Sequence, residues 1–302
     1  MKGNNTRMYI NLKDLAKSAK INKPMTIAVA GAHDHVVLDA LAKASNYIKF
    51  DVILIGIKNE INELLKQYNL NVKEVIDTND LTQMGEFAVK CIRENKANVI
   101  MKGLVDTKYV LKPVVNSETG IKKSKLLSHV SLMTFENQHK SYFFTDGAMN
   151  IAPTAEQKLL IAENAVWVAQ QLGIKHPKVA VISAVEKLNP KIQSTVDAEW
   201  LKSQPHNGYD LSGPFAIDNI ASEEAAKHKG ITDPVALNPD ILLFPELVSG
   251  NVFYKTSVFF GNGSTAGCII GANVPIILTS RADSAETKFN SILFGVLLNS
   301  HE

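Results

Sequence analysis

The sequence has little cysteine, little arginine and no excess of one charge. Two cysteines in 302 residues are too few for a disulfide framework, and they are too far apart for a closely spaced zinc site. Basic and acidic side chains nearly balance, 32 against 30, so no strong field favours nucleic acid or an anionic membrane. A small molecule is therefore the expected partner. The scarce residues are Cys91, Cys268, Arg7, Arg93 and Arg281.

Long apolar runs are also missing. Residues 1–23 are polar and rich in Lys and Asn, and no later run reaches the ~18 apolar residues of a membrane-spanning helix. The sequence therefore predicts a cytoplasmic protein. With 45% hydrophobic and 21% charged residues, it has the composition of a folded chain long enough for two packed domains.

Apolar, β-branched runs alternate with amphipathic stretches along the whole chain. This pattern is typical of βα units, and it predicts an α/β fold with mostly parallel sheets covered by helices on both faces. A second series begins after Pro153, where Thr154 predicts the cap of a long helix. The runs that predict strands lie at 26–32, 51–57, 71–76, 97–103, 178–184, 240–245, 266–272 and 274–280.

Four loops of the expected α/β fold carry unusual residues. Ligands of open α/β sheets bind beyond the carboxyl ends of the strands, so the chemistry is expected in these loops. They span residues 103–107, 146–153, 245–251 and 279–284.

The segment 279–291, TSRADSAETKFNS, combines hydroxyls, a guanidinium and carboxylates at a strand-to-helix junction. Free backbone N–H groups at a helix start favour an anion, and Arg281 adds a two-pronged contact for phosphate. The alternative is that Ser280 and Ser284 are ordinary caps and that Arg281 pairs with Asp283 or Glu286. A capping serine would not exclude phosphate binding by the arginine.

A second candidate anion pocket lies at a βα turn between residues 102 and 113. Gly103 lacks a Cβ, which lets a ligand approach the backbone, and lysines surround it. The alternative is that the lysines are solvated on a helix face and that the threonine is an N-cap. The candidate residues are Lys102, Gly103, Thr107, Lys108 and Lys112.

Two further segments predict contacts with phosphate or an amide. In 244–255, Asn251 and Lys255 share one face of a helix that follows a buried strand. In the glycine-rich stretch 261–267, Ser264 and Thr265 follow backbone N–H groups that can cradle a phosphate. Loop, cap and turn roles are the alternatives.

Metal chemistry has little support. His33, Asp34 and His35 follow the first predicted strand without a third ligand nearby, so loop and capping roles are favoured over a metal site.

Five segments together resemble the phosphate acetyltransferase and butyryltransferase family. They occur in the family's order, and the absence of a long N-terminal extension resembles its butyryltransferase branch. The segments are KGLVDT at 102–107, FFTDGAMNIAPTAEQ at 143–157, GPFAIDNIAS at 213–222 with Asp218, DILLFPELVSGNVFYK at 240–255 and VPIILTSRADSAETKFNS at 274–291.

The resemblance implies an isocitrate/isopropylmalate dehydrogenase-like fold of two three-layer αβα domains with an interdomain cleft. Residues 1–150 and 272–302 would form the first domain and 151–271 the second. Ser280 and Arg281 would then lie at the cleft, and the protein would form a homodimer or a larger homo-oligomer.

The resemblance also implies reversible transfer of a short acyl group, butyryl first, between coenzyme A and inorganic phosphate. Arg281 would bind phosphate, Ser280 would stabilise the developing oxyanion or phosphate, and Lys102 or Thr107 would complete the anion pocket. Coenzyme A and phosphate act as substrates, and neither a metal nor a tightly bound cofactor is required.

Two positions depart from the acetyltransferase pattern. Thr287 stands where acetyltransferases carry an aspartate assigned as general base, so Asp283 and Glu286 are the candidate bases here. Lys112 stands where they tend to carry arginine, and a lysine supplies charge without the planar fork.

Three other functions are weighed against butyryl transfer. Phosphate acetyltransferase is the first alternative. A metal-dependent, NAD-linked decarboxylating dehydrogenase of the isocitrate type normally needs several arginines, which this chain lacks. The third is a binding protein without turnover.

Overall fold

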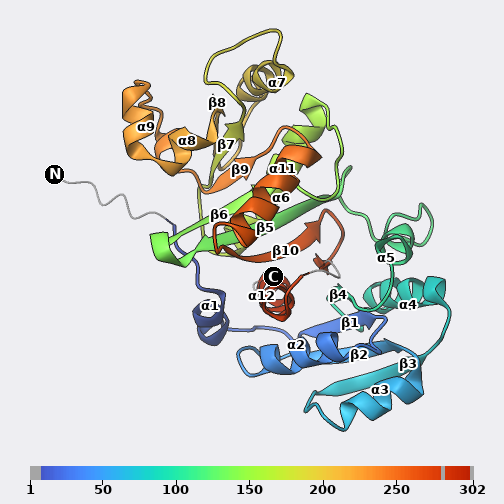
Figure 1. The fold of residues 1–302 in the computed structure, drawn as a ribbon. Coiled ribbons are helices and arrows are strands. Elements are labelled where there is room, and N and C mark those ends of the chain that lie inside the picture. The colour runs from blue at the N-terminus through green and yellow to red at the C-terminus, as the bar shows by residue number, and fades with distance from the viewer. Residues whose placement is uncertain (1–7, 280–282, 300–302) are drawn as a thin grey trace. The chain divides into compact units, whose positions relative to one another are not determined.

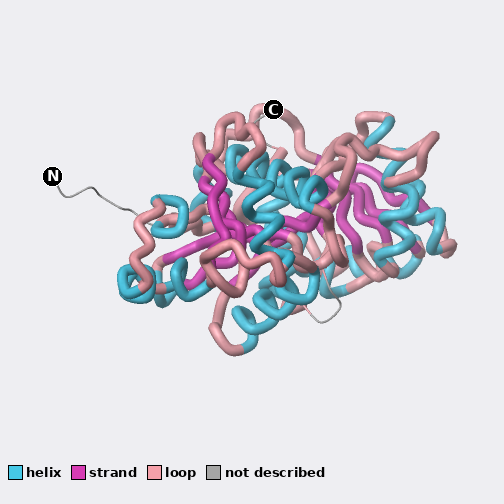
Figure 2. The backbone as a smooth tube through the Cα atoms, turned by 90° about the horizontal axis from the view of Figure 1, so that it is seen from above, coloured by secondary structure: helices cyan, strands magenta, loops and turns pink. Residues whose placement is uncertain are grey.

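The computed structural model describes residues 8–279 and 283–299. They fall into two compact units: unit 1 contains the chain up to residue 10 and residues 128–265, and unit 2 contains residues 11–127 and 266 onward. The domain bounds expected from the sequence lie at other residues and stay a prediction. Helix, strand and loop alternate along the backbone of both units (Figures 1 and 2).

Unit 2 is built on strands in the order β3-β2-β1-β4-β11-β10. β1, β2, β3, β4 and β11 pair in parallel, whereas β10 runs antiparallel to β11. The strands are β1 (Thr26–Ala30), β2 (Asp51–Gly56), β3 (Val72–Asp77), β4 (Val99–Lys102), β10 (Ser264–Ile270, whose first two residues count with unit 1) and β11 (Ile276–Ile277).

Several helices of unit 2 begin at a side chain that accepts hydrogen bonds from free N–H groups. Asp34 accepts from the N–H of Val36 and caps α2, which gives the His33–His35 segment the capping role favoured above. Asp80 caps α4 in the same way. The helices are α1 (Leu12–Ser18), α2 (His35–Ser45), α3 (Lys58–Leu65), α4 (Leu81–Arg93), α5 (Thr107–Val114) and α12 (Ala285–Leu297).

Unit 1 is built on strands in the order β5-β6-β9-β7-β8. β6, β9, β7 and β8 pair in parallel, and β5 runs antiparallel to β6. The strands are β5 (Ser128–Phe135), β6 (Lys140–Thr145), β7 (Lys178–Ile182), β8 (Asp210–Phe215) and β9 (Ile241–Leu243).

The long helix of unit 1 confirms the predicted cap at Thr154. Its hydroxyl accepts from the N–H of Gln157, whose side chain accepts from the N–H of Thr154. The helical segments are η1 (Glu136–Gln138), α6 (Ala155–Gln171), α7 (Gln193–Lys202), α8 (Ile217–Ala221), α9 (Glu223–His228), α10 (Pro234–Leu237) and α11 (Leu247–Phe259).

Each unit buries its own apolar core. The strand β1 of unit 2 is buried along its whole length. In unit 1, Phe144 is 1% exposed and packs edge-on against Phe244 and Phe253. These cores hold the strand ends in fixed positions, which matters for the loops that follow them.

The expected fold is wrong in two respects. The sheets are mixed, because the antiparallel strands β5 and β10 are built into them, and three strands (β5, β6 and β8) were not predicted. Residues 217–228 form two short helices and not one, because Ser222 ends α8 and caps α9 by accepting from the N–H of Ala225.

Candidate functional site

The carboxyl ends of β4 and β11 are neighbours in unit 2. The strands are parallel, with Ile276 opposite Ile100 and Ile277 opposite Met101. The loops at 103–107 and 279–284 therefore start from adjacent strands, as a ligand site at a strand edge requires. Ser280 and Arg281, the centre of the predicted phosphate site, lie outside the described residues.

Gly103 packs directly against the end of β1. Its N–H donates to Ala30 O (2.8 Å), and a Cβ at this position would lie 2.2 Å from the carbonyl oxygen of Gly31. The glycine is therefore needed for the close contact of two strand-end loops.

Lys102 is a buried cation beside Gly103. Only 6% of it is exposed, and its Nζ lies 3.3 Å from the carbonyl oxygens of Gly103 and Val105. Charged groups this deep in a protein are usually paired or functional, so Lys102 remains a candidate anion ligand.

The other candidates in this loop lie on α5. Asp106 stands at the N-cap position, so Thr107 is the first helical residue and not the cap. Lys108 and Lys112 are exposed, and Lys108 Nζ lies 4.8 Å from the ring centre of Tyr109.

The start of α12 is held by its own side chains. Ser284 Oγ accepts from the N–H of Thr287 (3.1 Å), which confirms the capping role considered for this serine. Lys288 Nζ donates to the carbonyl oxygen of Asp283 (2.7 Å). Asp283 is half-buried, and Glu286 is exposed in the first turn.

In unit 1, the carboxylate of Asp146 organises the loop after β6. Asp146 is 3% exposed. Its Oδ1 accepts from the N–H groups of Ala148 (2.8 Å) and Met149 (2.9 Å). Its Oδ2 accepts from the N–H of His129 (3.2 Å) and from both the N–H and the amide Nδ2 of Asn150 (3.3 and 2.6 Å). The carboxylate thus fixes the loop by satisfying its backbone donors.

The loop after β6 also touches the start of α11. A Cβ on Gly250 would lie 2.5 Å from Asp146 O, and Asn251 Nδ2 donates to Gly147 O (3.0 Å). Glu246 caps α11 by accepting from Val248 N and Ser249 N. Burial pushes the pKa of Glu246 up, but its hydrogen bonds outweigh burial and leave the pKa below its ordinary value. Two of the four predicted loops, 146–153 and 245–251, therefore meet within unit 1.

The remaining candidates lie apart from this contact or have local partners. Lys255 Nζ lies 4.7 Å from the ring centre of Tyr254 on α11. Asp218 on α8 pairs with Lys229 at 2.8 Å. Ser264 and Thr265 are the first residues of β10.

The glycine-rich stretch before β10 closes α11. The N–H groups of Gly261 and Gly263 donate to Thr256 O (3.0 Å) and Ser257 O (2.8 Å). These two backbone donors are therefore already used within the chain.

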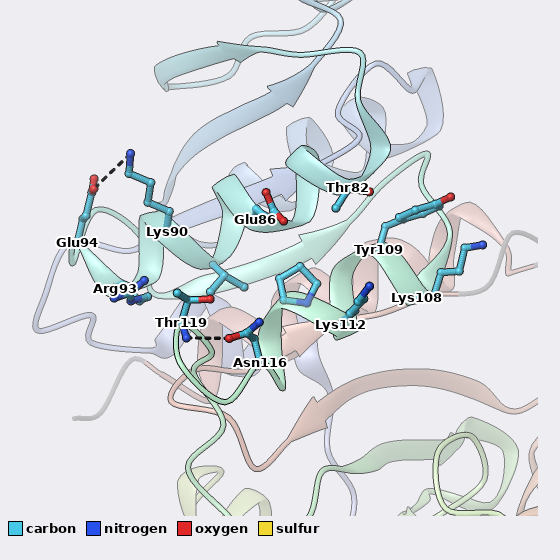
Figure 3. A pocket seen from close by; sticks show the side chains of 12 residues that line it. Thr82, Glu86, Lys90, Arg93, Glu94, Lys108, Tyr109, Lys112, Asn116 and Thr119 are labelled. Carbon is cyan, nitrogen blue, oxygen red and sulfur yellow. Dashed lines mark hydrogen bonds and ion pairs between the residues drawn. The ribbon is translucent and has the colours of Figure 1, made fainter.

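Two features escaped the sequence reasoning. The role of Asp146 had one weak signal, a carboxylate that closely follows the apolar residues Phe143 and Phe144. A groove of about 810 Å³ also lies along α4 and α5 in unit 2, and we call it the α4–α5 groove (Figure 3). One hint of this groove was present in the sequence, because Arg93, which lines it, is one of only three arginines in the chain. The other lining residues are Thr82, Glu86, Val89, Lys90, Glu94, Lys108, Tyr109, Lys112, Pro113, Asn116 and Thr119.

Neither a metal cluster nor a membrane helix is found in the part of the chain that the structure describes. No three His, Cys, Asp or Glu side chains gather there as metal ligands. None of the helices described is both long and apolar enough to cross a membrane.

Residues 80–296 match the model of the family described as phosphate acetyl/butaryl transferase. The chain is 41% identical to a phosphate butyryltransferase of Clostridium beijerinckii, over 96% of this chain and 98% of that protein. It is 36% identical to a phosphate acetyltransferase of Thermotoga maritima, over 93% and 97%. Among solved structures, a branched-chain phosphotransacylase from Enterococcus faecalis V583 matches with a TM-score of 0.82 and 33% identity, over 92% and 99%.

The structural matches correct the expected fold relationship. A phosphotransacetylase from Streptococcus pyogenes, 22% identical, matches with a TM-score of 0.78 over 95% of this chain and 98% of its own. The predicted isocitrate/isopropylmalate dehydrogenase-like architecture is therefore wrong as a description of this fold, which is that of the phosphotransacylases. Because the family model and the relatives cover most of the chain at well over 30% identity, this protein belongs to the phosphate acetyl/butyryltransferase family.

Proposed function

We propose that this acyltransferase moves a short acyl group, butyryl in preference to acetyl, reversibly between coenzyme A and inorganic phosphate. The structural observation that most supports a site in unit 2 is the parallel pairing of β4 with β11. This pairing brings the ends of β4 and β11 together, which supports an anion pocket built from the loops that follow the two strands.

The reaction needs no covalent intermediate with the enzyme. A phosphate oxygen attacks the thioester carbonyl, the C–O bond of the acyl phosphate forms, and the C–S bond breaks. The sulfur of CoA leaves with the electron pair and takes up a proton. In the reverse direction a base removes that proton, since a thiol with a pKa near the ~8.5 of cysteine is mostly protonated at neutral pH.

In this proposal, binding and positioning carry much of the rate. Arg281 holds phosphate, Ser280 donates to the developing oxyanion or to phosphate, and Lys102 or Thr107 completes the anion pocket. The base is Asp283 or Glu286. The variants Asp283→Asn and Glu286→Gln distinguish the two candidates. Only substitution of the true base should remove the limb of the pH–rate profile that arises from its ionisation.

Further parts of the proposal concern the wider surroundings. The protein holds no resident metal or cofactor, forms a homodimer or larger homo-oligomer and works in the cytoplasm. Light scattering of the purified protein tests the assembly, and turnover in the presence of a chelator tests the independence from metal. The additional residues proposed for phosphate or CoA binding are Gly103, Lys108, Lys112, Asp218, Asn251, Lys255, Ser264 and Thr265.

A thiol-release assay tests the function directly. Purified enzyme is given phosphate with acetyl-, propionyl-, butyryl- or isobutyryl-CoA, and release of CoA is followed with a thiol reagent. We expect phosphate-dependent release with the highest kcat/KM for a four-carbon acyl group, because one methylene changes discrimination by about 1–3 kcal/mol. A maximum at acetyl-CoA would make the protein a phosphate acetyltransferase, and no phosphate-dependent release would refute acyl transfer.

A further inference from the structure

The loop between β4 and α5 carries one exposed apolar side chain beside the proposed anion pocket. This loop is residues 103–106, and Gly103 and Val105 are buried in it. Leu104 lies between them in the chain, with 47% of its surface exposed. It comes two residues after Lys102, the buried cation of the candidate site.

Hydrogen bonds fix the backbone on both sides of Leu104. Its own N–H donates to Gly31 O (2.8 Å), which ties it to the loop after β1. The N–H of Val105 donates to Gly103 O (2.9 Å), which closes a γ-turn with Leu104 at its centre. The main chain therefore holds this loop in place, and the leucine side chain is not needed for that purpose.

Two further contacts hold the same turn. A Cβ on Gly31 would lie 2.9 Å from the carbonyl carbon and oxygen of Leu104, so the two loops are already in contact. Lys102 Nζ donates to the carbonyl oxygens of Gly103 and Val105, at 3.3 Å each. A positive charge and an apolar side chain are therefore presented within one turn of the chain.

A single exposed leucine is ordinary on a protein surface, so its position decides what it means. The two loops of the proposed site, 103–107 and 279–284, contain only two large apolar residues, Leu104 and Val105. Val105 is 2% exposed and belongs to the core. Leu104 is thus the one large apolar side chain that these two loops can offer to a ligand.

The proposed substrate needs an apolar contact as well as an anion pocket. Its phosphate and carbonyl groups are polar, but a butyryl chain carries two more methylene groups than acetyl. Those groups gain free energy when an apolar surface removes them from water. An apolar residue next to the reacting carbonyl is therefore what distinguishes the two acyl chains.

We infer that Leu104 contacts the hydrocarbon chain of the acyl group and favours butyryl over acetyl. This inference rests on the proposed function, and it adds a specificity residue to the site. The contact concerns only the carbons beyond the carbonyl. Leu104 therefore changes the discrimination between acyl groups and not the turnover of acetyl-CoA.

Three substitutions of Leu104 test the inference through one ratio, kcat/KM for butyryl-CoA divided by kcat/KM for acetyl-CoA. Leu104→Ala removes most of the apolar contact, and we expect the ratio to fall about tenfold, the lower end of what one methylene is worth in an apolar pocket. Leu104→Asn keeps a branched side chain but makes it polar, so it should lower the ratio at least as much. Leu104→Met keeps an apolar side chain of similar size and should retain most of the preference.

Val115→Ala is the matched control. Val115 is also 47% exposed and follows the last residue of α5, a helix of 8 residues that is about 12 Å long. The ratio should not change in this variant. Because the ratio does not depend on the fraction of active enzyme, partial unfolding of a variant does not imitate the expected result.

Two results would overturn the inference in an enzyme that works as proposed. The first is a ratio in Leu104→Ala equal to that of the wild type. The second is an equal loss of turnover with both acyl-CoAs in Leu104→Ala and Leu104→Asn. That result would assign the leucine to the part of the substrate that both acyl-CoAs share, or to the loop itself.

Failure of the proposed function would look different. Wild-type enzyme that released no CoA in a phosphate-dependent reaction would refute acyl transfer, and the role of Leu104 would fall with it. Wild-type enzyme that preferred acetyl-CoA would refute the butyryl preference together with its assignment to this residue. Both results are read from the wild type alone, before any variant is measured.

Discussion

Two regions of this protein use their polar groups in opposite ways. In unit 1, the loop of residues 146–150 folds around the buried carboxylate of Asp146, whose oxygens accept from the backbone of the loop itself. In unit 2, Arg93 and Lys112 line an open groove and pair with no carboxylate among the described residues. Polar groups of the first kind hold a conformation, and those of the second kind are available to a ligand. Substitutions should therefore change unfolding in the first region and kinetics in the second.

The largest effect is expected for Arg281→Ala. The proposal assigns the phosphate contact to this guanidinium, so its loss should lower kcat/KM about 10²- to 10³-fold, as for removal of one transition-state donor. The thermal midpoint should stay close to that of the wild type. Initial rates at varied phosphate and a melting curve measure the two quantities.

Arg281→Lys is the matched control for charge without the fork. It should recover only part of the activity, because an ammonium group cannot make the bidentate contact. If Arg281→Ala turned over substrate like the wild type, Arg281 would not be part of the anion site. The contrast between structural and ligand-binding polar groups would then lose its main functional example.

Asp146→Ala should give the largest loss of stability. The substitution leaves several partly buried N–H groups without an acceptor, and a buried group of this kind costs about 1–3 kcal/mol, so we expect a total loss of about 3 kcal/mol. Chemical denaturation measures the free energy of unfolding. Asp39→Ala is the control, because an exposed pair with Lys43 contributes less than about 1 kcal/mol.

The comparison would break if Asp146→Ala unfolded like the wild type but lost turnover. Such a result would mean that the carboxylate serves the reaction and not the loop. It would place Asp146 with the groove residues in function, in spite of its burial.

Sequence patterns predicted much of the fold where one kind of residue dominates an element. The strand β1 is a run of buried apolar residues, and α12 begins at a serine cap, so both could be read directly. The hairpin of β5 and β6 was missed because Ser128, Ser141 and Lys140 are polar and yet buried there. β8 was missed because Gly213 and Pro214 look like a turn, although a proline is tolerated in a strand at the end of a sheet.

The candidate site could be predicted only in part for a similar reason. Lysines around Gly103 are visible in the sequence, but the contact of Gly103 with Gly31 O depends on the pairing of β1 with β4. The role of Asp146 depends on where four backbone N–H groups point, which no residue type encodes. The acyl-transfer activity was predicted from the family resemblance and not from local residue patterns.

Gly85→Ala tests the helix contact beneath the α4–α5 groove. Alanine favours a helix over glycine by up to about 1 kcal/mol, but a Cβ here meets Tyr109 O, and overpacking costs about 1–3 kcal/mol. We expect a net loss of about 1–2 kcal/mol and a raised KM for butyryl-CoA, because the helices must separate. Ala88→Gly in the same helix is the control: its stability loss should be similar and its KM unchanged. An unchanged KM in Gly85→Ala would separate the groove from substrate binding.

The smallest effect is expected at Asp218. Substitutions here distinguish a structural role of this carboxylate from a role in ligand binding. Its hydrogen bond with Lys229 holds the pKa of Asp218 below the ordinary value, and the same contact raises the pKa of Lys229. The pair therefore contributes stability above the ordinary range of a carboxyl group. That contribution is lost as pH falls through the lowered pKa of Asp218, and at the other extreme as pH rises through the raised pKa of Lys229.

Lys229→Met should lower the melting temperature slightly at neutral pH. This difference from the wild type should shrink in acid, where Asp218 is protonated, and in high salt, because both groups are exposed and screened. If Asp218→Asn instead leaves melting unchanged and raises KM for butyryl-CoA, this carboxylate acts on the ligand, and the ion pair with Lys229 describes only the enzyme without substrate.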